Sequence, residues 1–294
     1  MFAPLTSPHN PRVKAAARLR DRRGRTQQQR IVIDGVRELL RAVEGGIEID
    51  EVFVGEAAAP HLTADTDDRN ASSGASHSHH PAEWRQLAER LRSSSASCFV
   101  VPPRLLEKLA FGERDSGIVA TARMPRRELS ELRLPADPLV VVIEGVEKPG
   151  NVGAILRTAD AAGVSAVIVA DGGTDLFNPN AIRASLGAIF TVPVCEADSV
   201  ATRDWLESRG LRIHAARVDG AVDYGQANLA PPAAIVLGSE ATGLSAVWHG
   251  SRVAAIKLPM LGHVDSLNVS TTAAILMYES LRQRQSSRTI VNAR

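Results

Sequence analysis

The chain is poor in the residues that mark several common classes of protein. Only 2 of its 294 residues are cysteine, Cys98 and Cys195, and they lie far apart with no CxxC pair. This spacing supports neither a disulfide framework nor a zinc site, so we expect two buried, unreactive thiols. No apolar run is long enough to cross a bilayer, and residues 1–14 lack the apolar stretch of a secretion signal. We therefore expect a cytoplasmic protein.

Excess charge of one sign is also missing overall, since the net charge is +1, but the charge is unevenly distributed. Residues 12–41 hold ten arginine or lysine residues against three acidic ones. A cationic segment attracts polyanions, and arginine forks onto phosphate, so the segment indicates contact with nucleic acid, with RNA as the commonest cytoplasmic polyanion. A solvated helix face is the alternative. The predicted RNA-binding residues are Arg12, Lys14, Arg18, Arg22, Arg23 and Arg25.

Large apolar residues are almost absent from residues 57–81, which are rich in Ala, Ser, Thr, Asp and His. This composition predicts an exposed, mobile insertion. It contains His77, His79 and His80, but three histidines in a serine-rich loop lack the fixed geometry that a metal site needs. We therefore predict no metal site.

The remaining sequence predicts two domains. Apolar residues make up 44% of the chain and charged residues 23%, which is ordinary globular composition. Residues 1–125 alternate helix-like and strand-like pieces around the insertion and predict a small α/β domain, beginning with a helix over residues 11–23. The segment MPRRELSELRLPADP carries three prolines and mixed charge, which places an interdomain linker at residues 126–138.

Residues 139–294 predict a second α/β domain with longer apolar strands. These strands lack the alternation of a half-exposed sheet and are separated by helices, so they predict a mostly parallel sheet covered on both faces. Ligands of such sheets bind beyond the carboxyl ends of the strands. The predicted strands lie near 139–143, 166–170, 190–194, 211–216, 233–237 and 252–258.

The first of these strands leads into a glycine loop that is not a nucleotide cradle. Gly145 and Gly150 have the GxxxxG spacing of a Walker A loop, but Asn151 and Val152 stand where Lys and Ser/Thr are needed. The glycines do not form GxGxxG either, and Pro149 removes a backbone donor that an anion nest would use. Taken alone, this loop predicts only a helix capped by Asn151 and a surface cation at Arg157.

Two later loops carry the same mixture of glycine and polar residues after a predicted strand. One is IVLGSEATGL, residues 235–244, and the other is IKLPMLGHVDSLNVSTTAAILMYE, residues 256–279. Because the carboxyl ends of parallel strands share one edge of a sheet, the three loops are expected to converge on one ligand.

The segments NVGAILRT, LGSEATGL and LPMLGHVDSLNVSTTAA resemble, in order and separation, the three motifs of the SpoU/TrmH family of RNA 2′-O-ribose methyltransferases in the SPOUT superfamily. The resemblance covers about residues 139–285, and residues 7–43 are similar, more loosely, to the substrate-recognition domain of many members. It implies a C-terminal trefoil knot, S-adenosyl-L-methionine bound bent on the knotted loops without a metal, and a homodimer with its active site near the subunit interface.

The resemblance also implies roles for individual residues. Transfer of a sulfonium methyl to a ribose 2′-hydroxyl needs two reactants held in line and one proton removed. The motif positions that match the family's catalytic set are Asn151, Arg157, Glu240, Ser266 and Asn268, and those that match its cofactor contacts are Gly238, Leu258, Met260 and Leu267. For Glu240 and Ser266, loop and helix capping is the plainer alternative.

Two roles for Arg157 stay open. The family position assigns it as general base, but a guanidinium is normally protonated and has no acceptor atom. The alternative is that Arg157 grips the phosphate beside the target ribose and stabilises developing alkoxide.

We expect the RNA to be 23S ribosomal RNA, because a separate α/β recognition domain resembles that of the ribosomal members. A transfer-RNA 2′-O-methyltransferase is one alternative, and a non-catalytic RNA-binding or ribosome-assembly factor on the same fold is another. An antibiotic-resistance methylase would share all of these features.

Overall fold

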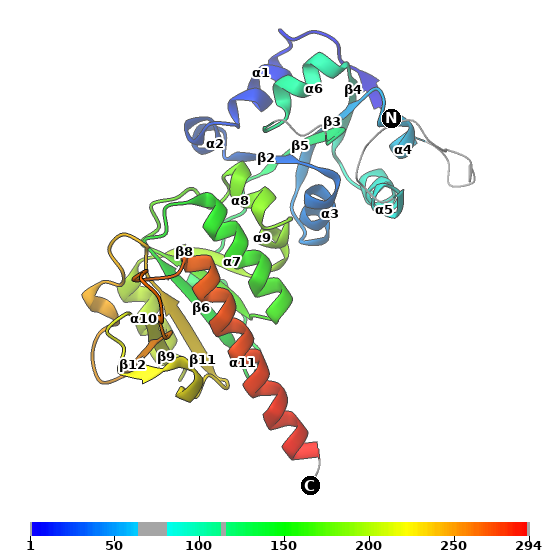
Figure 1. The fold of residues 1–294 in the computed structure, drawn as a ribbon. Helices are drawn as coiled ribbons and strands as arrows, with labels where there is room; N and C mark the ends of the chain where they lie inside the picture. The colour runs from blue at the N-terminus through cyan, green and yellow to red at the C-terminus, as the bar shows by residue number, and fades with distance from the viewer. Residues whose placement is uncertain (1, 64–80, 113–115, 293–294) are drawn as a thin grey trace. The chain divides into compact units, whose positions relative to one another are not determined.

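The computed structural model describes residues 2–63, 81–112 and 116–292, and these form two compact units (Figure 1). The first unit comprises Met1–Pro125 together with Phe177–Thr191, and the second comprises Arg126–Leu176 and Val192–Arg294. The second unit begins at Arg126, within the segment expected as a linker, and the return of Phe177–Thr191 to the first unit was not predicted. His77, His79 and His80 lie outside the described residues.

The first unit is built on a mixed sheet. Strands β1, β4 and β3 run parallel to one another, and β5 pairs antiparallel with both β3 and β2. In sheet order the strands are β1 (Phe2–Pro4), β4 (Ser97–Val101), β3 (Ile49–Gly55), β5 (Ile118–Arg123) and β2 (Arg30–Asp34). The helices are α1 (Pro11–Arg18), α2 (Arg22–Gln28), α3 (Val36–Glu44), α4 (Ala59–Thr63), α5 (Pro81–Arg92), α6 (Pro103–Leu109), α8 (Pro179–Ala184) and α9 (Ala188–Thr191).

Two predictions for this unit were wrong in part. The helix expected over residues 11–23 is interrupted, because α2 turns back so tightly that a Cβ on Gly24 would lie 1.9 Å from the carbonyl oxygen of Arg18. The start of the expected insertion is not exposed, since Leu62 in α4 is buried and α4 packs on α5. The rest of the insertion, residues 64–80, lies outside the described residues.

The second unit contains the predicted parallel sheet, in which every strand pairing is parallel. In sheet order the strands are β10 (Val222–Asp223), β12 (Val253–Lys257), β9 (Arg212–Ala216), β11 (Ala233–Leu237), β6 (Leu139–Glu144), β7 (Ala166–Ala170) and β8 (Val194–Ala197). The prediction of a strand at 190–194 was wrong: residues 188–191 form α9 in the first unit, and β8 begins at Val194. A short apolar run does not distinguish a strand from a buried helical turn by its pattern.

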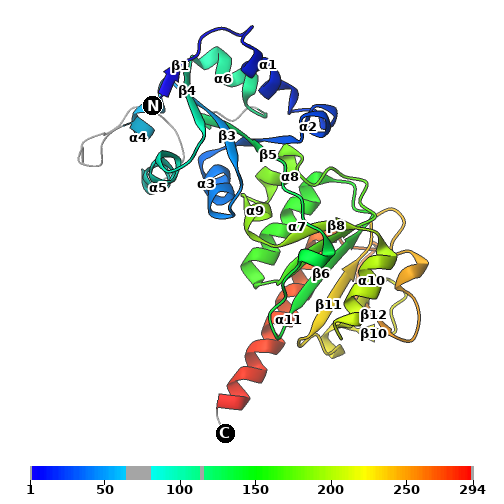
Figure 2. The same cartoon turned by 180° about the vertical axis from the view of Figure 1, so that it is seen from behind.

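Helices cover both faces of this sheet. Helices α7 (Pro149–Ala162) and α11 (Val269–Asn292) pack together on one face, and α10 (Ser199–Ser208) lies on the other (Figure 2). The core on the α10 side contains alternate residues of the strands with Leu206 and Trp248. Leu132, inside the expected linker, is 1% exposed and belongs to this core, so that segment is packed rather than free. Short 3-10 turns occur at η1 (Leu129–Glu131), η2 (Tyr224–Gln226) and η3 (Ala246–Trp248).

The two cysteines differ in their surroundings. Cys195 is buried in β8, and burial raises the pKa of its thiol to about 12. Cys98 in β4 is half-buried, and burial is also the main cause that raises the pKa of its thiol. A raised pKa disfavours the reactive thiolate form, so both cysteines are weakly reactive. The prediction that Cys98 is buried was wrong.

Within the described ranges no helix combines the length and the apolar character needed to span a membrane.

Candidate functional site

The three predicted loops meet at the carboxyl edge of the parallel sheet, after β6, β11 and β12. Asn151 Nδ2 donates to Glu240 Oε1 at 3.2 Å. Asn268 Nδ2 donates to the same Glu240 oxygen at 2.8 Å and to Asn151 Oδ1 at 3.2 Å. One residue from each loop thus joins a hydrogen-bonded group, which we call the amide–carboxylate cluster: Asn151, Glu240 and Asn268.

The local structure fixes how Asn268 faces this cluster. Its Oδ1 accepts the backbone N–H of Ser270 at 2.9 Å and the Ser270 hydroxyl at 2.6 Å, which caps the first turn of α11. Its Nδ2 is therefore directed at the cluster. Asn151 lies inside the first turn of α7, where Lys148 is the N-cap residue, so the interpretation of Asn151 as a simple helix cap was wrong.

Lys148 is a member of the site that the sequence did not predict. Its Nζ lies 2.8 Å from Glu240 Oε2, which leaves Oε1 for the two asparagines. The hydrogen bond from Lys148 is the main cause that lowers the pKa of Glu240, assisted by the Val269 backbone N–H and by Asn151. Glu240 in turn raises the pKa of Lys148. This ion pair links the loop after β6 to the loop after β11.

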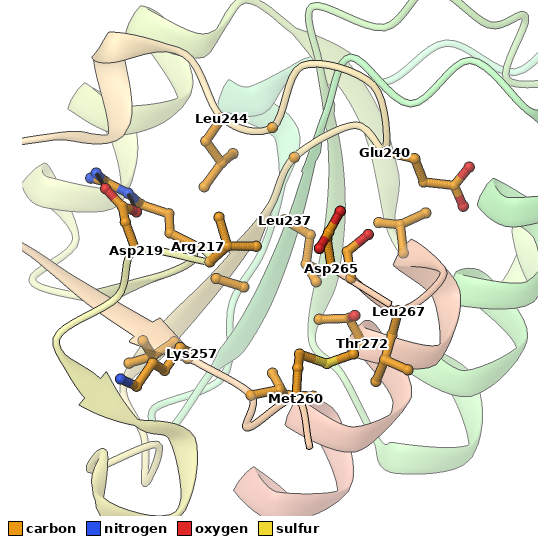
Figure 3. A pocket seen from close by; sticks show the side chains of 18 of the residues that line it. Arg217, Asp219, Leu237, Glu240, Leu244, Lys257, Met260, Asp265, Leu267 and Thr272 are labelled. Atoms are coloured by element: carbon orange, nitrogen blue, oxygen red, sulfur yellow. Dashed lines mark hydrogen bonds and ion pairs between the residues drawn. The ribbon is translucent and has the colours of Figure 1, made fainter. Parts of the chain in front are cut away.

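A cavity of about 1160 Å³ opens beside the cluster, between the loops that follow β9, β11 and β12 (Figure 3). Leu237, Met260 and Leu267 line it, with Glu240 at one side and Arg217 and Asp219 at the other (Figure 3). The predicted residues that line this cavity are Gly238, Glu240, Leu258, Met260, Ser266 and Leu267.

The fold of its own loop requires glycine at position 238. A Cβ at this position would lie 2.3 Å from the carbonyl carbon of Gly243 and 2.6 Å from the nitrogen of Leu244. These are backbone atoms, so no rotamer change relieves the clash. Gly238 therefore lets the 238–244 loop fold back on itself, where Ser239 and Gly243 form a bridge.

The far side of the cavity carries charged residues that sequence analysis missed. Arg217 and Asp219 form a two-pronged ion pair, with contacts of 2.6 and 2.9 Å, in which Arg217 lowers the pKa of Asp219. Lys257 and Asp265 also line the cavity. All four residues end or follow a strand at the edge of the sheet where ligands bind. This position after a predicted strand could have identified them from the sequence.

Arg157 is not joined to the cluster within this chain. It is exposed on α7, and its side chain forms no hydrogen bond or ion pair with any residue in the described part of the structure. Six residues of helix turn the chain by roughly 600°, so Arg157 lies about 120° around the axis from Asn151. Its exposed guanidinium therefore lies away from the amide–carboxylate cluster.

The cationic segment of the first unit is less uniform than predicted. Arg25 is 1% exposed and donates to the carbonyls of Leu19 and Arg20 at 2.6 and 2.8 Å, so its assignment to RNA was wrong. Arg12 is held by Glu51 at 2.6 Å and stacks on Phe99. The remaining predicted RNA-binding residues are exposed, namely Lys14, Arg18, Arg22 and Arg23.

Among the residues that the structure describes, no three His, Cys, Asp or Glu side chains are grouped so as to hold a metal ion.

A parallel α/β unit with a cavity at the carboxyl edge of its strands, preceded by a small mixed α/β unit, defines a two-domain protein of the ligand-binding α/β class. Residues 138–278 match the model of the SpoU rRNA Methylase family, and residues 10–120 match the MRM3-like substrate binding domain. The chain belongs to the SpoU rRNA methylase family.

Individual relatives agree with this assignment. The chain is 32% identical over 215 residues to the 23S rRNA (uridine(2479)-2′-O)-methyltransferase of Streptomyces viridochromogenes, covering 71% of this chain and 74% of that protein. It is 36% identical over 191 residues to the 23S rRNA (guanosine-2′-O-)-methyltransferase RlmB of Vibrio vulnificus, covering 63% and 77%.

Solved structures cover nearly the whole chain. A crystal structure of an RNA 2′-O ribose methyltransferase superposes with a TM-score of 0.75 at 38% identity, over 96% of this chain and 99% of that one. The SpoU methyltransferase AviRb from Streptomyces viridochromogenes, solved in complex with the cofactor AdoMet, gives a TM-score of 0.77 at 27% identity, over 95% and 99%.

Proposed function

We propose that this protein transfers a methyl group from S-adenosyl-L-methionine to a ribose 2′-hydroxyl of ribosomal RNA, in the cytoplasm and as a homodimer. The observation that carries the proposal is the amide–carboxylate cluster, which joins the three motif loops beside a cavity at the ligand edge of the sheet. The relatives named as 23S rRNA 2′-O-methyltransferases support the choice of reaction and RNA.

The cavity has room for the cofactor and a lining that suits it. At about 1160 Å³ it slightly exceeds the range of roughly 300–1,000 Å³ for small-ligand sites. Leu258, Met260 and Leu267 offer aliphatic surface for a purine, and the charged far side offers partners for an amino-acid group. When bound there, S-adenosylmethionine supplies a methyl group that is already activated as a sulfonium, with a neutral thioether as leaving group.

The cluster residues position the reactants. Glu240 is a poor general base, because its pKa is lowered and its oxygens already accept from Lys148 and the asparagines. Its role is to hold the loops in register. We assign Ser266, which is exposed and lines the cavity, to orient the ribose.

We assign Arg157 to the phosphate beside the target ribose and to the alkoxide that develops on the 2′-oxygen. A guanidinium has five donors and no acceptor, which suits both anions and does not suit a base. Its exposure on α7 leaves these donors free to meet RNA or a second protomer. The exposed cations Lys14, Arg18, Arg22 and Arg23 of the first unit would contact RNA phosphates elsewhere on the substrate.

The test is to map ribose methylation on total RNA from cells with and without the gene, and to titrate the purified protein with S-adenosylmethionine by calorimetry. We expect one ribosomal ribose to lose its methyl group and one cofactor to bind per chain. Loss of a transfer-RNA methyl instead would overturn the choice of RNA. A folded protein that gives no heat with the cofactor would overturn the enzyme and favour a non-catalytic RNA-binding factor.

The homodimer and the trefoil knot are proposed from the family resemblance. Sedimentation equilibrium tests the first: a mass of one chain, at concentrations where the enzyme is active, would contradict it.

A further inference from the structure

A buried carboxylate lies at the carboxyl end of β6, outside the amide–carboxylate cluster. Glu144 is 5% exposed and accepts four hydrogen bonds. Its Oε2 accepts the backbone N–H of Ser245 at 2.7 Å. Its Oε1 accepts the Ser245 hydroxyl at 2.8 Å, the Trp248 Nε1–H at 2.8 Å and the Ser199 hydroxyl at 2.5 Å. All four groups donate to the carboxylate, so both of its oxygens act as acceptors.

Two of these partners lie in the loop that forms one wall of the cavity. Ser245 directly follows the 238–244 stretch, which carries Glu240, and Trp248 lies three residues further on. Their sequence neighbours Leu244 and His249 line the cavity. Trp248 is fully buried, and Arg203 of α10 holds the same loop by donating to the Val247 carbonyl at 2.6 Å.

Along the chain, Glu144 is followed by Gly145 and the loop that leads to Asn151. The same carboxylate thus ties the end of the strand that carries Asn151 to the loop that carries Glu240. The hydrogen bond between Asn151 and Glu240 depends on this register, because a shift of about 1 Å in either loop would break a contact of 3.2 Å.

We propose that Glu144 is a positioning residue for methyl transfer, holding the 238–250 loop in the one arrangement that accepts S-adenosylmethionine. The inference rests on the proposed function. Glu144 touches neither the cavity nor the cluster, so it acts through Ser245 and Trp248.

The donors on Glu144 make a specific demand that glutamine does not meet. The Ser245 N–H and the Trp248 Nε1–H are donors only, and they sit on different oxygens of the carboxylate. An amide offers one oxygen and one NH₂, so one of the two N–H groups would face another donor. When the NH₂ group of glutamine takes the position of Oε1, the two serine hydroxyls can rotate and accept from it. The Trp248 Nε1–H cannot accept, so it is then the one donor that faces another donor.

This geometry predicts a rescue that a merely structural role would not show. Glu144→Gln leaves a buried donor opposed, so we expect S-adenosylmethionine to bind about tenfold more weakly, because fewer molecules hold the competent loop. Trp248→Phe removes the opposed donor. In the double variant Glu144→Gln/Trp248→Phe, the loss of affinity should be at least about threefold smaller than the product of the two single losses.

The experiment measures calorimetric affinity for S-adenosylmethionine and amide hydrogen exchange of residues 238–250 in the full chain. The matched control is Thr202→Val, which removes a buried hydroxyl of α10 that donates to the carbonyl of the N-cap residue Asp198 and leaves the Glu144 contacts in place. Support is weaker binding and faster exchange in Glu144→Gln, at a Tm no lower than that of the control, with rescue in the double variant. Wild-type affinity in Glu144→Gln, or losses that simply multiply, would overturn the proposal.

Two further outcomes are separated by the same measurements. If Glu144→Gln does not fold, Ser245→Ala replaces it, since it removes one hydroxyl contact and keeps the N–H; unchanged affinity and exchange there would overturn the inference. If the wild-type protein does not bind the cofactor, the proposed function fails, and loop exchange then decides the inference alone: faster exchange in Glu144→Gln than in Thr202→Val supports the positioning role, and equal exchange rejects it.

Discussion

The side-chain amide of Asn268 donates to the carboxylate of Glu240, with Nδ2 and Oε1 2.8 Å apart. The oxygen of the same amide caps α11 through the N–H of Ser270. One side chain therefore serves the stability of a helix and the geometry of the site by its two different atoms.

Asn268→Asp should separate these two roles. Aspartate keeps the capping oxygen, so the cap on α11 survives, but it loses the Nδ2 donor and brings a second negative charge to Glu240. We expect methyl transfer to fall at least tenfold while the Tm changes by only a few degrees. Steady-state kinetics and thermal unfolding measure this, with Ser270→Ala as the control that disturbs only the cap side. Full activity in Asn268→Asp would show that the Glu240 contact has no role in turnover.

Arg157→Lys should lower kcat at least about a hundredfold, because lysine keeps the charge but lacks the planar fork that grips phosphate and alkoxide. The Tm should be unchanged, since the Arg157 side chain forms no hydrogen bond or ion pair within the described residues of its own chain. Single-turnover methylation of RNA is the measurement, and Arg209→Lys, an exposed arginine on Trp205, is the control. Turnover close to wild type would remove Arg157 from both roles considered for it.

Glu240 should make the stability of the second unit depend on pH. Its pKa in the folded state is lowered below the ordinary value of 4.5, chiefly by the Lys148 hydrogen bond. The unfolded chain therefore takes up the proton first as the pH falls, and the contribution of Glu240 is full above about 4.5 and is lost as the pH falls through the lowered pKa. The free energy of unfolding of Glu240→Gln should approach that of wild type below pH 4. A difference that stays constant from pH 7 to pH 3 would contradict this.

His214 should give a pH effect of the same sign in a higher pH range. It is 6% exposed on β9, and burial, followed by the charge of Arg212, lowers the pKa of its imidazole. The unfolded chain binds the proton at a higher pH than the folded chain, so stability should fall as the pH drops below about 6.5, by up to roughly 1.4 kcal/mol per pH unit. In His214→Leu that slope between pH 6.5 and 5 should vanish. Denaturant unfolding at several pH values measures it, and an unchanged slope would assign the effect to other groups.

Substitution of Arg25 should affect stability, whereas substitution of Arg23 should affect RNA binding, although both residues belong to the same basic segment. Arg25→Ala removes a buried guanidinium from two carbonyls and should cost roughly 1–3 kcal/mol of stability. Arg23→Ala should leave the Tm unchanged, weaken RNA binding, and reduce the slope of log K against log salt by about 1. Filter binding at several salt concentrations checks this pair. Equal salt slopes for wild type and Arg23→Ala would exclude a phosphate contact at that residue.

The sheet was predictable from the sequence because β6, β7 and β11 are continuous apolar runs of strand length, separated by helical patterns. The convergence of Asn151, Glu240 and Asn268 was predictable because parallel strands end at one edge. Glycines and polar residues after those strands marked the loops.

Other features depend on contacts that no local pattern encodes. The hydrogen-bond partners of Glu144 lie 55 to 104 residues away in the sequence. Its four donors could therefore not be predicted from an acidic residue at the end of a strand. Arg25 resembles its neighbours in sequence, but the turn at Gly24 carries it inward. Residues 188–191 have the composition of a strand, but they form helix α9, which packs on α3 of the first unit.

The membership of Phe177–Thr191 in the first unit has a consequence for synthesis on the ribosome. Helix α9 packs against α3 and α8 against β2, and a Cβ at Gly45 would lie only 2.3 Å from the Phe190 carbonyl oxygen. When the ribosome has made residue 125, these contacts do not yet exist, and β6 and β7 emerge before they form. The N-terminal half must therefore wait, with the surface of α3 uncovered, until the nascent chain has passed residue 191.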